Sequence, residues 1–135
     1  MPGLLPFWAV HLLAVARILF CEDNPTIRRL LEVSLRGGPH EVEIAPDGAA
    51  GLALAERWRP DLIITDISMP DMDGFALVTA VRAHPTLSAV PVLVMSATME
   101  RDKLESIVAQ GANGFLTKPF SPQSLREAIA AHLPA

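Results

Sequence analysis

Short runs of hydrophobic residues alternate with amphipathic stretches along the chain from residue 17 onward. Four runs have apolar residues at their centres and one alternates with polar residues; together they predict five strands, at residues 18–21, 42–45, 61–66, 91–96 and 114–118. Between the strands, apolar residues recur every three or four positions, which predicts five helices. Asn24-Pro25 and Ser121-Pro122 are typical of helix starts, and Pro60 and Gly111 of helix ends.

Strands that are apolar on both faces and joined by helices indicate a parallel sheet covered on both sides. The sequence therefore predicts an α/β protein of the doubly wound class. Its 135 residues fit one domain, and 50% of them are hydrophobic, which is enough for a packed core. The formal net charge of -4 gives no basic excess for a nucleic-acid backbone, so we expect no nucleic-acid partner. The single cysteine, Cys21, excludes an intramolecular disulfide and a cysteine-based zinc site.

Residues 1–16 form an apolar N-terminal extension that contains no Asp, Glu, Lys or Arg. The extension is shorter than the ~18 residues of a membrane-spanning helix, and no basic residue precedes it as in a secretory signal. Although Ala14-Val15-Ala16 has the form of a cleavage site, we expect a cytoplasmic chain with no membrane partner. The extension is then either a tail that packs on a neighbouring surface or translated sequence upstream of the true start.

Polar residues stand where four of the predicted strands end, namely Glu22 and Asp23, Asp66, Ser96 and Lys118. In an open parallel sheet these ends share the carboxyl edge, where ligands bind at the point at which the winding reverses. Each residue alone would be interpreted as a helix cap, a turn hydroxyl or a surface charge. Their coincidence at four strand ends predicts one common site.

The charges at this edge favour a bound cation. Three carboxylates so close together repel one another, and one divalent cation together with Lys118 would bring their formal charge to zero. Oxygen ligands without His or Cys favour Mg²⁺ over zinc, and a hard cation, a carboxylate, a hydroxyl and a lysine suit phosphoryl transfer. A calcium loop around Asp71 lacks two ligands, and Asp73 is expected to cap the helix that starts at Gly74.

Four motifs carry a resemblance to a known family: residues 22–25 (EDNP), 60–74 (PDLIITDISMPDMDG), 91–97 (PVLVMSA) and 111–120 (GANGFLTKPF). In this order and at this spacing they resemble the receiver domain of bacterial two-component response regulators. The resemblance extends over residues 17–133, which we take as the domain. It implies a flavodoxin-like (βα)5 fold with a five-stranded sheet in the order 2-1-3-4-5.

The resemblance also implies a role for each residue of the site. Asp66 would accept a phosphoryl group from a phosphohistidine on a sensor histidine kinase or a histidine phosphotransfer domain. Asp23, Asp66 and the backbone carbonyl of Ser68 would bind Mg²⁺ directly, and Glu22 would hold it through water. Lys118 would pair with the phosphoryl oxygens, and the bond between Lys118 and Pro119 would be cis.

A conformational switch is implied as well. The Ser96 hydroxyl would move toward the phosphoryl group, and Phe115 would turn inward into the space left behind. The surface of the fourth helix, the fifth strand and the last helix would then change shape, and we expect a homodimer through this surface to tighten on phosphorylation. A plain core aromatic is the alternative for Phe115. Ser68 and Thr98 stand at positions that would set the lifetime of the phosphoryl group.

Two other functions stay open from the sequence. One is a Mg²⁺-dependent phosphohydrolase with Asp66 as nucleophile, although such enzymes usually carry a second acid where this chain has Ser68. The other is an adaptor that binds partners without phosphorylation. We favour a cytoplasmic receiver that is not an enzyme.

Overall fold

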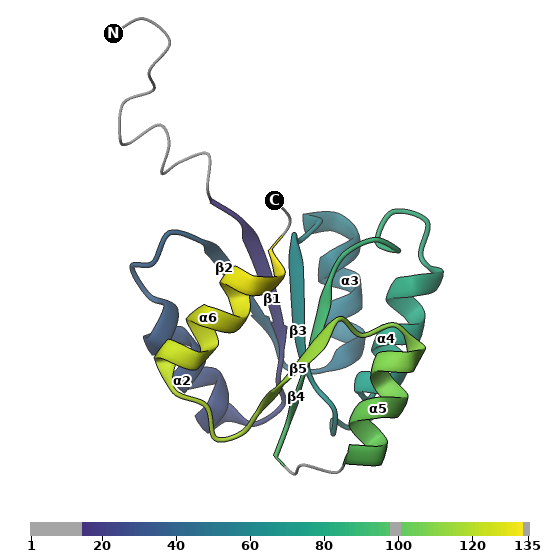
Figure 1. Cartoon of the computed structure of the whole chain (residues 1–135). Helices are drawn as coiled ribbons and strands as arrows, with labels where there is room; N and C mark the ends of the chain where they lie inside the picture. The colour runs from purple at the N-terminus through teal and green to yellow at the C-terminus, as the bar shows by residue number, and fades with distance from the viewer. Residues whose placement is uncertain (1–14, 98–100, 134–135) are drawn as a thin grey trace, which may run out of the picture.

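The structure, a computed structural model, describes residues 15–97 and 101–133 (Figure 1). Its strands are β1 (Arg17–Cys21), β2 (Glu41–Ala45), β3 (Leu62–Asp66), β4 (Val92–Ser96) and β5 (Gly114–Thr117). Its helices are α2 (Pro25–Leu35), α3 (Gly48–Trp58), α4 (Gly74–Ala83), α5 (Arg101–Gln110) and α6 (Pro122–His132). Thr98 and most of the predicted extension, residues 1–14, lie outside the described residues.

The five strands form one parallel sheet in the order β2-β1-β3-β4-β5, which confirms the predicted order. Helices α2 and α6 cover one face of the sheet, and α3, α4 and α5 cover the other (Figure 1). The chain therefore reverses its winding between β1 and β3. The carboxyl ends of these two strands are adjacent, which is where a doubly wound sheet places its ligand site.

The core has two halves because side chains alternate between the faces of each strand. Ile18, Phe20 and Ile64 pack toward α2 and α6, whereas Leu19 and Ile63 pack toward the other three helices. Every residue of β3 and β4 is buried. This two-sided burial explains why these strands appear in the sequence as unbroken apolar runs.

Each strand lies within one residue of its predicted bounds, and two of the shifted boundaries lie next to prolines. Strand β4 begins at Val92 because Pro91 has no N–H for the ladder, although its carbonyl accepts from the N–H of Ile63 at 3.0 Å. Strand β5 ends at Thr117, one residue short of Lys118, and the Lys118–Pro119 bond is cis. The N–H of Lys118 still donates to the carbonyl of Ser96 at 2.7 Å, so the lysine stays at the sheet edge.

Side-chain caps start the helices where the sequence predicts them. The Asn24 side chain accepts from two backbone N–H groups at the start of α2, and Asp73 accepts from the N–H of Ala76 at 2.9 Å. Ser121 and Ser124 form a reciprocal capping box at α6. Within the described part of the chain, no helix has the length and apolarity needed to cross a membrane.

Candidate functional site

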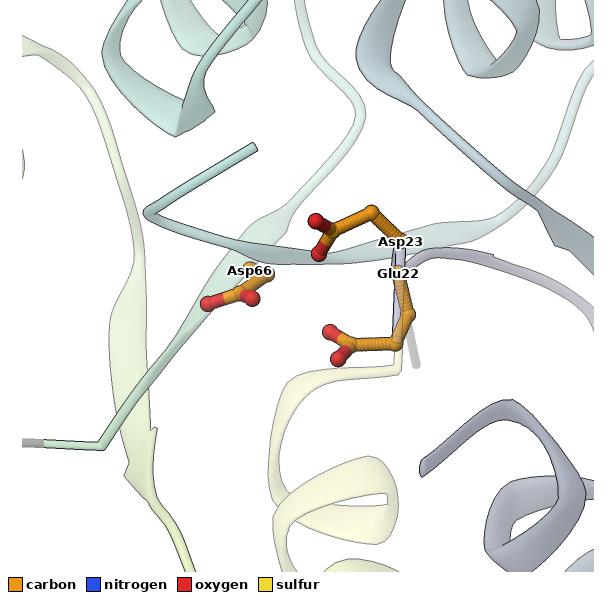
Figure 2. A group of neighbouring side chains, drawn as sticks. All are labelled: Glu22, Asp23 and Asp66. Atoms are coloured by element: carbon orange, nitrogen blue, oxygen red, sulfur yellow. The ribbon is translucent and has the colours of Figure 1, made fainter. Parts of the chain in front are cut away.

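Three acidic side chains meet at the carboxyl edge of the sheet (Figure 2). Glu22 and Asp23 directly follow β1, and Asp66 is the last residue of the neighbouring strand β3. One carboxylate oxygen from each residue lies within 4.8 Å of the other two. The predicted convergence of these carboxylates is therefore correct, and it follows from the parallel pairing of β1 with β3.

Lys118 forms ion pairs with two of the three carboxylates. Its Nζ lies 3.1 Å from both carboxylate oxygens of Glu22 and 3.1 Å from Oδ2 of Asp66. Three carboxylates and one ammonium group leave a formal charge of -2 in a site where Glu22 and Asp66 are buried. One divalent cation would cancel this charge.

Glu22 is the most deeply buried acid of the group, with an exposed fraction of 0%. Burial raises its pKa from 4.5 to about 7, the Lys118 hydrogen bond acts in the opposite direction, and the neighbouring Asp66 charge raises it further. The protein therefore holds a carboxylate whose charged form is unfavourable without more positive charge nearby. A cation beside it would stabilise the ionised form.

Ser96 and Ser68 flank Asp66 in different ways. Ser96 is the last residue of β4, is buried, and stands one register position beyond the partner of Asp66. Ser68 is exposed in the loop after β3, where it lines an open cleft together with Asp23, Phe75 and Lys103. Of the three acids, Asp23 is the one that lines this cleft, so the cleft reaches the acidic group through Asp23.

Phe115 lies on β5 with 45% of its surface exposed. It is not a core aromatic, so the alternative interpretation of this residue is wrong. Val108 on α5 is also exposed, at 44%. The outward position of Phe115 is the one that the predicted switch requires before phosphorylation.

Arg28 holds the backbone of the acidic pair and was not singled out from the sequence. Its Nη1 donates to the carbonyls of Glu22 and Asp23, at 3.0 and 2.7 Å. Arg28 stands one turn into α2, and its side chain returns to the loop before the helix. In the sequence, Arg28 is simply a basic residue shortly after an acidic pair. This pattern is so common that it does not predict the contact.

Gly74 keeps the loop after Asp66 close to the sheet. Its N–H donates to the carbonyl of Ile67 at 2.8 Å. A Cβ atom at this position would lie 2.8 Å from the Asp66 carbonyl oxygen and 2.9 Å from Cα of Ile67. Because both atoms belong to the backbone, only glycine fits without moving the segment that carries Asp66.

The donor chemistry of the acidic group fits Mg²⁺. Glu22, Asp23 and Asp66 offer only carboxylate oxygens, the ligands of a hard cation, and no imidazole or thiolate belongs to the group. Asp23, the most exposed of the three, faces the open cleft. Water in that cleft would supply further oxygen ligands to the ion.

The comparisons with known proteins agree with this fold and site. The model of the response regulator receiver domain family matches residues 18–130, and the chain therefore belongs to this family. The chemotaxis protein CheY of Pseudomonas aeruginosa is 37% identical over 114 residues, which cover 84% of this chain and 92% of CheY. The response regulator PleD of Caulobacter vibrioides is 41% identical over 106 residues, or 78% of this chain and 23% of PleD.

Solved structures match over almost the whole described fold. The chemotaxis protein CheY4 of Vibrio cholerae has a TM-score of 0.84 and 37% identity, covering 89% of this chain and 100% of that one. The receiver domain of a sensor histidine kinase from Pseudomonas aeruginosa PAO1 has a TM-score of 0.80 and 30% identity, covering 88% and 98%. That structure holds a magnesium ion in its active-site cleft. The predicted flavodoxin-like fold is thus confirmed.

Family membership establishes the class of function. The chain is a receiver domain of the two-component signalling system, and receiver domains interact with histidine kinases or phosphotransfer partners. Such domains are signalling modules, and the phosphohydrolase alternative is not favoured.

Proposed function

We propose that Asp66 is the residue that accepts the phosphoryl group. The observation that carries this assignment is the position of its carboxylate, which lies 3.1 Å from the Lys118 ammonium and within 4.8 Å of two further carboxylates. Of the three acids, Asp66 alone ends a strand at the centre of the sheet, and its neighbours include both Lys118 and Asp23, which lines the open cleft. It is therefore the acid that a phosphoryl donor reaches with a cation on one side and an ammonium group on the other.

The metal ligands that we propose are Asp23, Asp66 and the backbone carbonyl of Ser68, with Glu22 holding the ion through water. The bound Mg²⁺ would neutralise phosphoryl oxygens during transfer. Arg28 holds Glu22 and Asp23 in place for the metal, because its side chain donates to both of their backbone carbonyls.

The transfer step then uses three side chains. A carboxylate oxygen of Asp66 attacks phosphorus, a P–O bond forms, and the P–N bond of the partner's phosphohistidine breaks, with the electron pair leaving on the imidazole nitrogen. Lys118 keeps its proton and moves its ion pair from the Asp66 carboxylate to the phosphoryl oxygens. The Ser96 hydroxyl donates to one of the same oxygens.

We also propose that phosphorylation changes the surface formed by α5, β5 and α6. Phe115 and Val108 expose large apolar area there, and Ser96 links this surface to Asp66 through β4. When Ser96 turns toward the phosphoryl group, Phe115 gains room to move inward. A second copy of the chain would pair through this surface.

An apolar hollow beside Lys118 supports docking of the histidine-bearing partner. It is lined by Ile27 and Leu30 of α2 together with Pro119 and Phe120. A partner helix placed here would bring its histidine to the edge that carries Asp66. We propose that this exchange takes place in the cytoplasm, without nucleic acid or a membrane, and that the chain signals through shape and not as an enzyme.

Phosphorylation with a small donor tests the assignment of Asp66. The intact chain incubated with acetyl phosphate and Mg²⁺ is expected to gain the mass of one phosphoryl group, which hydroxylamine removes because it is an acyl phosphate. Asp66→Asn should abolish the gain, and Asp71→Asn, a change at an exposed loop carboxylate, should preserve it. Labelling that persists in Asp66→Asn would refute the assignment.

A turnover assay separates the two remaining functions. A receiver releases little product from an aryl phosphate, whereas a phosphohydrolase releases many equivalents per chain in the presence of Mg²⁺. An adaptor that works by binding alone would show neither turnover nor a gain in mass. The proposal requires the gain in mass without repeated turnover.

A further inference from the structure

An apolar groove lies at the end of the molecule opposite the acidic site. Its lining residues come from the last turns of α2 and α6, from the first residues of β1 and β2, and from the loop before β2. Its lining is mainly hydrophobic and includes Ile18, Leu35, Val42, Ile129 and Ala130. The proposed phosphoryl transfer uses none of these residues.

The groove is large enough for a bulky side chain. Its volume is about 210 Å³, and an apolar cavity of roughly 150 Å³ is known to bind benzene. A second, shallower hollow shares Leu35, His40 and Val42 with it and extends it past the end of α2. The second hollow adds the charged residues Glu32 and Arg36, so it is the first groove that suits an apolar segment with an aromatic anchor.

The chain enters the sheet directly beside this groove. The N–H of Ala16 donates to Nδ1 of His40 at 3.1 Å, and the Ala16 carbonyl accepts from the N–H of Glu41 at 2.9 Å. His40 and Ile18 both line the groove. Whatever precedes Ala16 therefore starts at the edge of the groove.

The preceding residues have the matching chemistry. Residues 1–14 carry no charged side chain, and their two largest apolar residues, Phe7 and Trp8, are adjacent. The eight residues 9–16 span up to about 26 Å when extended, which is ample to return the aromatic pair to the groove. A covalent tether also gives an effective concentration in the millimolar range, so that a modest contact is sufficient.

We propose that the N-terminal segment, residues 1–14, docks in this groove of its own chain, with Phe7-Trp8 as the anchor. The segment covers the apolar surface between α2 and α6 and leaves the acidic site open. It acts as an intramolecular strap at the base of the sheet. The occupant is this chain's own segment and not a second copy.

Trp8 fluorescence in the full-length chain tests the proposal. The chain has two tryptophans, so Trp58→Phe leaves Trp8 as the single reporter and keeps an aromatic ring beneath Arg17. Docking predicts blue-shifted Trp8 emission that acrylamide quenches poorly. Ala130→Glu, which places a charge in the groove, should abolish this protection.

Ala131→Glu is the matched control. Ala131 is also exposed on α6, but it does not line the groove. This variant should keep the protection of Trp8, and both variants should bind Mg²⁺ as the parent does, which verifies that they fold. Sedimentation under the same conditions should show a monomer, with protection that is independent of protein concentration.

Three results would each overturn the proposal. Trp8 emission typical of water in the parent chain would mean that the segment does not dock. Equal protection in Ala130→Glu and Ala131→Glu would place the segment elsewhere. Protection that appears only in dimers would make the occupant a second copy.

Discussion

The Glu22 carboxyl group shows how one residue connects folding to function. It is buried among Asp66 and Lys118, and burial raises its pKa from 4.5 to about 7. In the metal-free protein its ionisation therefore costs about 3 kcal/mol relative to the unfolded chain. Because a cation stabilises the ionised form, stability and metal binding are linked through this one group.

The raised pKa of Glu22 predicts how the stability of the metal-free protein changes with pH. Between pH 4.5 and about 7 the folded chain keeps the Glu22 proton that the unfolded chain has lost. The Glu22 contribution to the free energy of unfolding of the metal-free protein therefore falls as pH rises through this range and levels off above it. Urea denaturation at several pH values measures the effect. In Glu22→Gln the decline should be smaller, and an unchanged decline would contradict the raised pKa.

Magnesium affinity should have the opposite pH dependence. Below about pH 7 the bound cation must displace the Glu22 proton, so its apparent affinity falls by up to about tenfold per pH unit. Titration calorimetry between pH 6 and 8 reports the change. Glu22→Gln should bind more weakly at pH 8 but with a flatter pH profile. An equally steep profile in the variant would assign the proton to another group.

At the scale of elements, the loop from β3 to α4 depends on Gly74. Gly74→Ala brings Cβ to 2.8 Å from a backbone oxygen of Asp66, so we expect a loss of about 1–3 kcal/mol in unfolding free energy. Because the clash also moves the segment that carries Asp66, Mg²⁺ affinity should fall. Urea denaturation and metal titration measure the two effects.

Gly37→Ala is the control for this substitution. Gly37 has a φ of 74° and nothing within 4 Å of a Cβ at its position, so the change costs stability through backbone strain alone. Its Mg²⁺ affinity should be that of the parent. If Gly74→Ala also binds Mg²⁺ normally, the glycine is needed for packing and not for the geometry of the site.

The elements differ in how completely their sequences predict them. The apolar runs of β3 and β4 and the caps Asn24, Asp73 and Ser121 carry local signals, so these elements lie within one residue of where they were expected. The start of β4 shifted because Pro91 has no N–H for the ladder, which the apolar pattern does not show. Strand β5 ends before Lys118, although the Lys118 N–H still donates to the carbonyl of Ser96.

The site was only partly predictable for a related reason. Strand ends in a parallel sheet share one edge, so Glu22, Asp23 and Asp66 could be expected to meet. Two features depend on three-dimensional contacts that no local pattern encodes. They are the hydrogen bonds from Arg28 to the carbonyls of Glu22 and Asp23, and the close approach of Gly74 to the backbone of Asp66. The exposure of Phe115 likewise depends on what packs over β5.

At the scale of the whole molecule, we expect phosphorylation to control pairing. The surface of α5, β5 and α6 exposes Val108 and Phe115, and burial of such side chains between two copies would stabilise a dimer. Sedimentation with Mg²⁺ and beryllofluoride, a mimic of the phosphoryl group, should show a larger mass than without it. An identical mass in both conditions would contradict this prediction.

Two surface variants locate the pairing surface. Val108→Glu should prevent the increase in mass because it places a charge in the interface. Val33→Glu changes a residue that is 56% exposed on α2, which lies on the sheet face opposite to α5 and is not part of the proposed surface, and should leave the increase intact. If Val33→Glu prevents the increase in mass and Val108→Glu does not, the interface lies on α2 instead.

The most direct measurement for the whole account is the position of the phosphoryl group on the chain. Reduction of the acyl phosphate with borohydride converts the modified aspartate into homoserine, which peptide fragmentation then locates. We expect homoserine at position 66, only in samples that contained both Mg²⁺ and a phosphoryl donor. Homoserine at position 23, or none under conditions in which the chain binds Mg²⁺, would contradict it.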